Sequence, residues 1–252
     1  MKRVTSEDYT SEYFEYAADR YREGSEWARN KIDNVLPLLE LSKGDIIADI
    51  GCGIGTFALE SAKEGYRVYA VDYSPVALGI ARQLAGEIGV TGKITFILSS
   101  VEKIPIDSGA VDKVVSANFI EHLYPEQFDV LLRELSRIIK DGGCVVLYAP
   151  NPHEWNTRIP RPIRKIIKFL LRMPADNVIE DEQMAAKTKE MQAKYDRLHV
   201  HLKSAPYIRS KLKKNGFKVI HEKYVNIASQ LKNLPLIRTH VGGHILIRAR
   251  KV

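Results

Sequence analysis

The chain has 252 residues, a length that can bury one sizeable core, and a balance of apolar and charged residues typical of a folded α/β domain. Its two cysteines, Cys52 and Cys144, lie far apart, which argues against a disulfide framework and favours a reducing, cytoplasmic setting. No stretch has the form of a secretory signal, and no apolar run approaches the roughly 20 residues that a membrane-spanning helix needs.

The net charge of +7 is divided unevenly along the chain. Residues 1–150 contain 16 lysines and arginines against 23 acids, whereas residues 151–252 contain 22 against 8. A strongly basic C-terminal part predicts an anionic partner, such as phosphate groups, a membrane surface or nucleic acid. The alternative is a basic face that is merely solvated.

The first predicted elements are two helices. Tyrosines recur at helical spacing in residues 9–27, and residues 28–39 place Ile32, Val35 and Leu39 on one face. Ordinary amphipathic packing explains both patterns.

A glycine-rich turn then follows the first predicted strand. Residues 46–50 form a short apolar run typical of a buried parallel strand, and residues 57–64 read as a helix. Gly51, Gly53 and Gly55 lie between the two. Residues without Cβ let the backbone approach a ligand closely, and the helix N-terminus offers unpaired N–H groups. The pattern predicts a ligand-binding turn.

Two acidic residues indicate the kind of ligand. Asp49 stands directly before the first glycine, and the third glycine comes one residue earlier than in a dinucleotide fingerprint. An acid there would repel a pyrophosphate but suits a ligand with positive charge. Asp72 ends the next apolar run, residues 68–71, where it can take both hydroxyls of a ribose. An adenosine-like, cationic ligand without phosphates is S-adenosylmethionine.

On these residues the chain resembles the class I S-adenosylmethionine-dependent methyltransferases. Its Asp-x-Gly-x-Gly-x-Gly run and Asp72 match the first two motifs of that family, and the resemblance continues to about residue 150. It implies an α/β fold: a doubly wound, Rossmann-like sheet of seven mostly parallel strands with helices on both faces and an antiparallel last strand. The alternative is a glycine-rich turn in another doubly wound protein.

The remaining elements follow the order of the family. Ser74 and Pro75 begin a helix, residues 125–140 form another that ends at Gly142 and Gly143, and Ser204 begins a third. The predicted strands cover residues 46–50, 68–71, 94–98, 112–117, 144–149, 216–220 and 244–249.

We expect one methyltransferase domain over residues 1–252. Within it, residues 1–40 would form an N-terminal helical cap and residues 41–152 the cofactor-binding core. Residues 153–203 would form a basic helical insertion or lid between strands five and six. Residues 204–252 would supply the C-terminal helix and strand pair.

The resemblance implies a set of residues that bind S-adenosylmethionine and its product S-adenosylhomocysteine. Where many members have an aspartate after strand three, this chain has Ser100, so the side chain that contacts the adenine stays open. The backbone at Asn118 would meet the methionine end. The implied cofactor-binding residues are Asp49, Gly51, Cys52, Gly53, Gly55, Asp72, Tyr73, Ser100, Val101, Glu102 and Asn118.

The substrate side is predicted from residues near that cofactor. Members of the family often keep a histidine ahead of the helix that begins here at Ser204, so His201 and then His199 are the candidates for a general base. The two histidines have no cysteine or third ligand near them in the sequence, so we predict no metal site. Candidates for the lining of the substrate pocket are Tyr13, Tyr21, His122 and His153.

The insertion contains a basic amphipathic stretch, residues 161–173. Its apolar side chains Ile163, Ile166 and Leu170 recur at helical spacing, and arginines and lysines occupy the other side. Such a helix can lie on an anionic membrane surface, which would make the protein peripheral at the membrane. A lid helix with solvated charges is the equal alternative.

Together these features predict an enzyme that methylates a small molecule, at a hydroxyl of an amphiphilic, lipid-linked or anionic acceptor. The Asn/Asp-Pro-Pro-Tyr run of DNA amino-methylating enzymes is missing after strand four, and no cysteine is placed as a nucleophile for pyrimidine methylation, so nucleic acid is disfavoured. The alternatives are an RNA methyltransferase, a non-catalytic protein that binds cofactor or membrane, and a nicotinamide-dependent oxidoreductase. The acceptor, its reacting atom, the oligomeric state and the pathway stay open.

Overall fold

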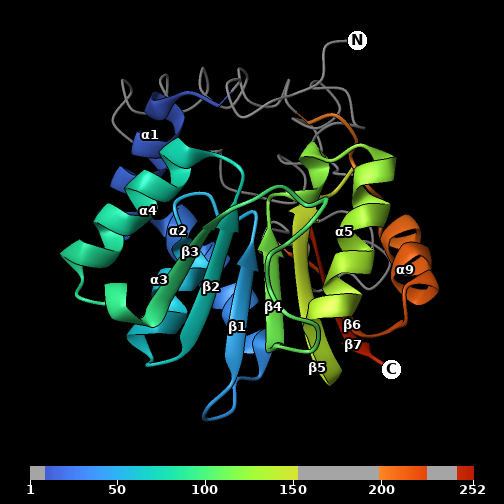
Figure 1. Ribbon diagram of the computed structural model, residues 1–252. Coiled ribbons are helices and arrows are strands. Elements are labelled where there is room, and N and C mark those ends of the chain that lie inside the picture. Colours follow the sequence, from blue (N-terminus) through green and yellow to red (C-terminus); the bar gives the residue numbers. More distant parts are fainter. Residues whose placement is uncertain (1–8, 153–198, 226–242) are drawn as a thin grey trace, which may run out of the picture.

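The computed structural model describes residues 9–152, 199–225 and 243–252, which build one seven-stranded sheet with helices around it (Figure 1). The predicted doubly wound, Rossmann-like α/β fold is confirmed. In their order across the sheet the strands are β3 (Ile94–Leu98), β2 (Arg67–Asp72), β1 (Ile46–Ile50), β4 (Val111–Ala117), β5 (Ile139–Pro150), β7 (His244–Lys251) and β6 (Phe217–Val225).

The strands β1 to β5 run parallel to one another. The last strand, β7, lies between β5 and β6 and is antiparallel to both, as predicted. The carboxyl ends of the parallel strands meet at one edge, and the chain leaves β1 and β4, which are neighbours, in opposite directions across the sheet. A crevice for a ligand forms at such a point in doubly wound sheets.

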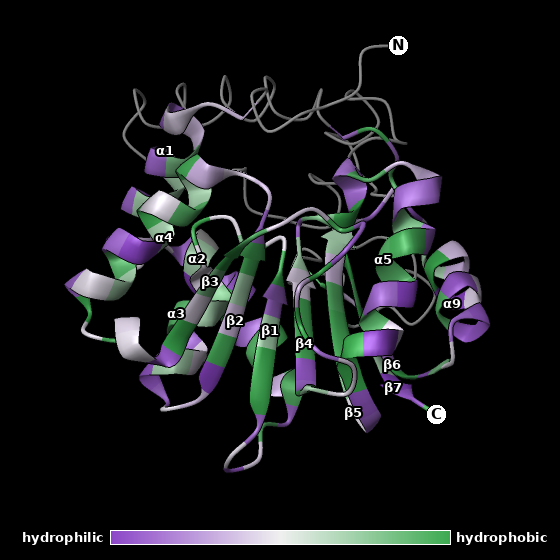
Figure 2. Ribbon diagram, viewed as in Figure 1, coloured by the Kyte–Doolittle hydropathy of each residue, from purple (hydrophilic) through white to green (hydrophobic). Residues whose placement is uncertain are grey.

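Helices cover both faces because successive side chains of a strand point to opposite sides. On β1, Ile47 packs with α1, α3 and α4, whereas Ala48 and Ile50 pack in the core beneath α5 and α9. The central strands are accordingly rich in hydrophobic residues (Figure 2). The helices are α1 (Ser11–Arg22), α2 (Glu26–Val35), α3 (Thr56–Lys63), α4 (Pro75–Glu87), α5 (Pro125–Ile138) and α9 (Ala205–Lys214), with 3₁₀ turns η2 (Leu36–Leu39), η3 (Thr91–Lys93) and η4 (Ile120–His122).

The predicted helix starts are observed with one difference. The Ser74 hydroxyl accepts the N–H of Ala77 at 3.2 Å and so caps α4. Ser204 occupies the N-cap position of α9, but its side chain makes no capping hydrogen bond.

Several element boundaries differ from the prediction, and two of these differences have a clear structural reason. The helix expected over residues 28–39 ends at Val35 and continues as the 3₁₀ turn η2, which contains Pro37, a residue that cannot donate an α-helical hydrogen bond. Strand five begins at Ile139 instead of Cys144, because Ile139 already pairs with Val111. A register shift between Val111 and Lys113 accommodates the extra residues.

Several predictions fall outside the described residues. The basic stretch 161–173, its contact with a membrane surface and the pocket residue His153 all lie in the part of the chain that is not described. They stay predictions. Among the described helices, none is long and apolar enough to span a membrane.

Candidate active site at the carboxyl ends of the central strands

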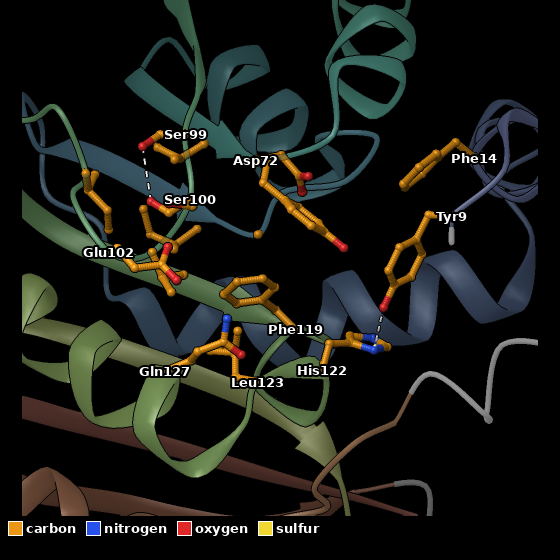
Figure 3. Close-up of a pocket in the computed structure, with 16 residues that line it drawn as sticks. Tyr9, Phe14, Asp72, Ser99, Ser100, Glu102, Phe119, His122, Leu123 and Gln127 are labelled. Atoms are coloured by element: carbon orange, nitrogen blue, oxygen red, sulfur yellow. Dashed lines mark hydrogen bonds between the residues drawn. The ribbon is translucent and has the colours of Figure 1, made fainter. Parts of the chain in front are cut away.

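A cavity of about 350 Å³ opens where β1, β2 and β3 end (Figure 3). Its lining comes from α1 and the segment before it, the turn after β1, the ends of β2 and β3, the segment after β4, and the start of α5. The lining includes Tyr9, Phe14, Gly51, Asp72, Tyr73, Ser99, Ser100, Val101, Glu102, Phe119, His122 and Gln127.

The turn after β1 brings bare backbone to this cavity. Gly51 and Gly53 have φ angles of +69° and +54°, a region that favours glycine. A Cβ at Gly51 would overlap the ring of Phe119, whereas a Cβ at Gly53 would meet nothing closer than Phe14 at 3.9 Å. The N–H of Gly51 donates to the carbonyl of Val71 at 2.9 Å, which joins the turn to β2.

Asp72 holds the same turn from the end of β2. Its two carboxylate oxygens accept the N–H groups of Gly53 at 2.8 Å and Ser74 at 2.9 Å. The residue is buried, and burial raises the pKa of its carboxyl group although these N–H donors favour the charged form. A carboxylate oxygen has two lone pairs, so both oxygens can also accept from a ligand in the cavity.

Asp49 lies behind the turn, and the cavity lining does not include it. Its Oδ2 accepts the N–H of Ala58 in the first turn of α3 at 3.1 Å, where the helix dipole favours an acid. The side chain is 1% exposed, and desolvation raises the pKa of its carboxyl group to about 7. Asp49 therefore supports the glycine turn through α3.

Asn118, directly after β4, has a strained backbone and an unsatisfied side chain. Its φ is +52°, although it is not glycine, and its N–H donates to the carbonyl of Tyr148 at 2.8 Å. Its Oδ1 is buried without a hydrogen-bond partner among the described residues. Strain and an orphaned polar atom at one residue are typical of ligand-binding positions.

The N-terminal segment closes the cavity with aromatic side chains. The Tyr9 hydroxyl is 2.7 Å from His122 Nδ1, and the Tyr9 ring lies 6.2 Å from Phe14 and 6.3 Å from Tyr73, centroid to centroid (Figure 3). Burial raises the pKa of Tyr9 far above its usual value, so the phenol stays protonated. Tyr9 thus links the cap to the segment after β4.

Known proteins resemble this chain over its central part. Residues 47–143 match the family described as "Methyltransferase domain". Over these residues the chain carries a methyltransferase domain, of the class I S-adenosylmethionine-dependent kind whose fold the solved structures share.

The curated relatives match the domain over part of their length. The ubiquinone biosynthesis O-methyltransferase of Vibrio parahaemolyticus is 35% identical over 103 residues, 40% of this chain and 42% of that protein. The probable fatty acid methyltransferase of Pseudomonas putida is 30% identical over 119 residues, 47% and 30%. The U6 snRNA (guanine-N(2))-methyltransferase THUMPD2 of Bos taurus is 32% identical over 120 residues, 46% and 24%. This chain spans less than half of each.

Solved structures share the fold over nearly the whole chain. A SAM-dependent methyltransferase from Aquifex aeolicus superposes with a TM-score of 0.62 at 17% identity, covering 97% of this chain and 100% of that one. Geranyl diphosphate C-methyltransferase from Streptomyces coelicolor, in complex with Mg2+, geranyl diphosphate and S-adenosyl-L-homocysteine, gives 0.60 at 16% identity, covering 88% and 78%.

The residues of this methyltransferase domain fit its cofactor, S-adenosylmethionine. The turn at Gly53 leaves room beside exposed backbone, Asp72 offers lone pairs for ribose hydroxyls, and Asn118 has an orphaned oxygen for a polar group. The wall of residues 99–102 would face the base. These groups would hold and orient the cofactor, whose activated methyl group would supply the chemistry.

The predicted site residues divide into those that line the cavity and those that do not. The lining contains Gly51, Asp72, Tyr73, Ser100, Val101, Glu102 and His122. Outside the lining lie Asp49, Cys52, Gly53, Gly55, Asn118, Tyr13, Tyr21, His199 and His201. The hydroxyl of Tyr21 donates to Glu60 Oε1 at 2.6 Å on α3, and Tyr13 packs against Tyr9 and Phe14.

The sequence interpretation missed Tyr9, Phe14, Phe119 and Gln127 as lining residues. Tyr9 precedes the N-cap Thr10, so helical spacing does not constrain its side chain. Phe119 follows the strained Asn118, and its ring lies where a Cβ at Gly51 would be. Phe119 could have been recognised from the sequence, because it is an aromatic residue directly after strand four. A glycine such as Gly51 has no Cβ, so an aromatic ring can pack against its backbone.

The histidines before α9 lie beside the cavity wall. His201 donates its backbone N–H to the carbonyl of Glu121 at 3.2 Å, and its ring packs 5.6 Å from Tyr207. Burial lowers the pKa of the His201 imidazole. His199 lies 5.0 Å from His122, ring to ring, so two histidines that are 77 positions apart in the sequence are neighbours.

Proposed function

We propose that this chain is an enzyme that transfers the methyl group of S-adenosylmethionine to a hydroxyl of a small amphiphilic, lipid-linked or anionic acceptor. The observation that carries the proposal is a single cavity whose lining includes both Asp72, at the cofactor end, and His122, beneath the N-terminal cap. One continuous cavity allows cofactor and acceptor to meet away from bulk water.

In this proposal the chain positions both reactants. Asp72 and the glycine turn fix the cofactor, and the rings of Phe14 and Phe119 supply apolar surface for an amphiphilic acceptor. His122 is the histidine in the cavity lining, so we place the acceptor hydroxyl beside it instead of beside His201. Tyr9 orients that imidazole through the 2.7 Å hydrogen bond.

Two observations outside the cavity support the acceptor class. The C-terminal part carries the excess of basic residues, which favours an acceptor with an anionic group. The relatives include proteins named for fatty acid methylation and for O-methylation in ubiquinone biosynthesis, and both names indicate lipid-like acceptors.

The test combines cofactor binding with turnover. Calorimetry with S-adenosylhomocysteine should detect binding that weakens roughly 100-fold or more in Asp72→Ala, because two charge-assisted hydrogen bonds to the ligand are lost. Asp129→Ala is the matched control, since its carboxylate pairs with Lys211 at the surface, 2.6 Å away. Transfer of labelled methyl groups to a panel of lipid-like and phosphorylated alcohols then identifies the acceptor. Binding that is equal in both variants would refute the cofactor site.

RNA methylation is the second candidate. The same basic C-terminal part and the relative named as a U6 snRNA methyltransferase favour it, so the prediction against a nucleic acid partner stays unconfirmed. RNA as the acceptor would require affinity that falls steeply with salt, since lysines and arginines that contact phosphates release counterions. Filter binding of transcribed RNA at several salt concentrations separates this candidate from a small-molecule enzyme.

A further inference from the structure

Three side chains able to bind a metal ion converge at the edge of the cavity. Glu121 and His122 belong to η4, directly after β4, and His199 comes from the segment before α9. One ligand atom from each lies within 4.8 Å of the other two. His122 also lines the cavity, so the cluster borders the space in which we place the acceptor.

Glu121 is a buried acid with an unsatisfied oxygen. The residue is 2% exposed, and its Oε2 has no hydrogen-bond partner among the described residues. Its Oε1 lies 3.9 Å from His122 Nε2, beyond hydrogen-bond distance. A buried carboxyl oxygen without a hydrogen bond is unfavourable, and a bound cation would satisfy it.

The surrounding residues hold the three ligands in place. Tyr9 bonds to Nδ1 of His122 at 2.7 Å, which leaves Nε2 directed toward Glu121. Metal-binding histidines commonly make such a second hydrogen bond, because it fixes the ring and its tautomer. Lys203 donates to the carbonyls of Ile120 at 2.6 Å and His201 at 2.9 Å, so it ties η4 to the segment that carries His199.

We propose that Glu121, His122 and His199 bind one divalent transition-metal ion of the zinc type. Two imidazole nitrogens and one carboxylate oxygen suit zinc and its first-row neighbours, whereas magnesium prefers oxygen ligands alone. Bonds of about 2.0–2.2 Å place ligand atoms around tetrahedral zinc roughly 3.3–3.6 Å apart. Small side-chain rotations close the present cluster to that size.

Nearby charges both favour and oppose such an ion. Burial raises the pKa of Glu121 to about 8, so a bound ion would displace its proton to gain a negative ligand, whereas Lys31 and Lys203 act on Glu121 with positive charge. Burial lowers the pKa of both lysines, to about 8 for Lys203, which therefore still carries most of its positive charge at neutral pH and opposes the ion. Three protein ligands leave an open coordination position, as in catalytic zinc sites.

The role of this ion rests on the proposed function, although its binding does not. An acceptor hydroxyl at the open position would lose its proton to solvent water more readily, because the ion stabilises the oxyanion. The electron pair left on that oxygen would then form the new bond to the methyl carbon, and the bond between that carbon and sulfur would break with its pair remaining on sulfur. The ion would take the place of the general base predicted at His201 or His199.

Direct metal binding tests the site. We would strip the purified full-length protein with a chelator and titrate it with ZnCl₂ by calorimetry and with CoCl₂ by visible absorption. We expect one ion per chain, with binding lost in His199→Ala and in Glu121→Gln, and retained in His221→Ala, an exposed histidine on β6. Tyr9→Phe should weaken binding by about 10- to 100-fold, as loss of a ligand's supporting hydrogen bond does.

Controls keep the outcomes distinct. Circular dichroism shows whether each variant is folded, and binding of S-adenosylhomocysteine in the same samples reports the cofactor site. Folded wild-type protein that binds neither ion, or variants that bind as tightly as wild type, would overturn the metal site even if methyl transfer occurs. Metal binding without methyl transfer to any acceptor would instead count against the proposed function.

Discussion

The two ends of the cavity are built in different ways. At the cofactor end, the glycine turn and Asp72 lie within one strand–helix–strand unit, and backbone N–H groups make the decisive contacts. At the proposed acceptor end, Tyr9 and His122 line the cavity and His199 lies beside His122, so three distant parts of the chain meet and side chains make the contacts. The cofactor end therefore depends on local conformation. The proposed acceptor end depends on a few contacts between side chains that are far apart in the sequence.

The largest effect on stability should come from adding a single methyl group to the glycine turn at the cofactor end. Gly51→Ala should lower the free energy of unfolding by about 2–5 kcal/mol, because the residue has φ of +69° and its Cβ would overlap Phe119. Gly53→Ala is the control: its φ is +54°, but no atom lies closer than 3.9 Å, so only the backbone term of about 1–2 kcal/mol applies. Urea denaturation measures both. Equal losses of unfolding free energy in the two variants would show that the Phe119 ring moves aside at no cost.

A smaller effect is expected from the residue that joins the distant segments. Lys203→Met should destabilise the protein by about 2–3 kcal/mol, because the carbonyls of Ile120, Leu123 and His201 lose a buried donor. The change should also weaken zinc binding, because losing the link between η4 and the segment of His199 outweighs the removal of one opposing charge. Binding of S-adenosylhomocysteine should stay intact, since Lys203 lies outside the cavity lining. Equal losses of both ligands would mean that the two ends of the cavity are not independent.

The smallest effect concerns how the stability of the protein depends on pH through Asp49, which supports the glycine turn at the cofactor end. Burial raises the pKa of Asp49 from 3.8 to about 7, so between these values the native state keeps a proton that the unfolded chain releases. This group therefore makes stability fall as pH rises from about 4 to about 7. Asp49→Asn cannot ionise and should gain on the order of 1 kcal/mol over wild type between pH 6 and pH 7. Denaturation curves of both proteins at both pH values test this. If the difference in unfolding free energy between variant and wild type does not change with pH, the pH dependence of stability arises from other groups.

Local patterns predicted the core of this domain well. The strand–glycine turn–helix unit around Gly51, the acid at the end of β2 and the cap at Ser74 were all recognisable, because each depends on neighbours a few residues away. Boundaries were less accurate where tertiary pairing extends an element, as at Ile139. The position of Asp49 behind the turn could not be read from spacing alone, because it depends on where α3 begins.

The sequence by itself determined the fold class, the cofactor turn and the uneven charge, since strand alternation, glycine spacing and composition are properties of the chain alone. Only the tertiary structure decided which aromatic residue closes the cavity and which histidine faces it. Only folding brings Glu121 and His122 to His199. A residue's neighbours within the chain are fixed by covalent order, whereas contacts between distant segments depend on how the whole core packs.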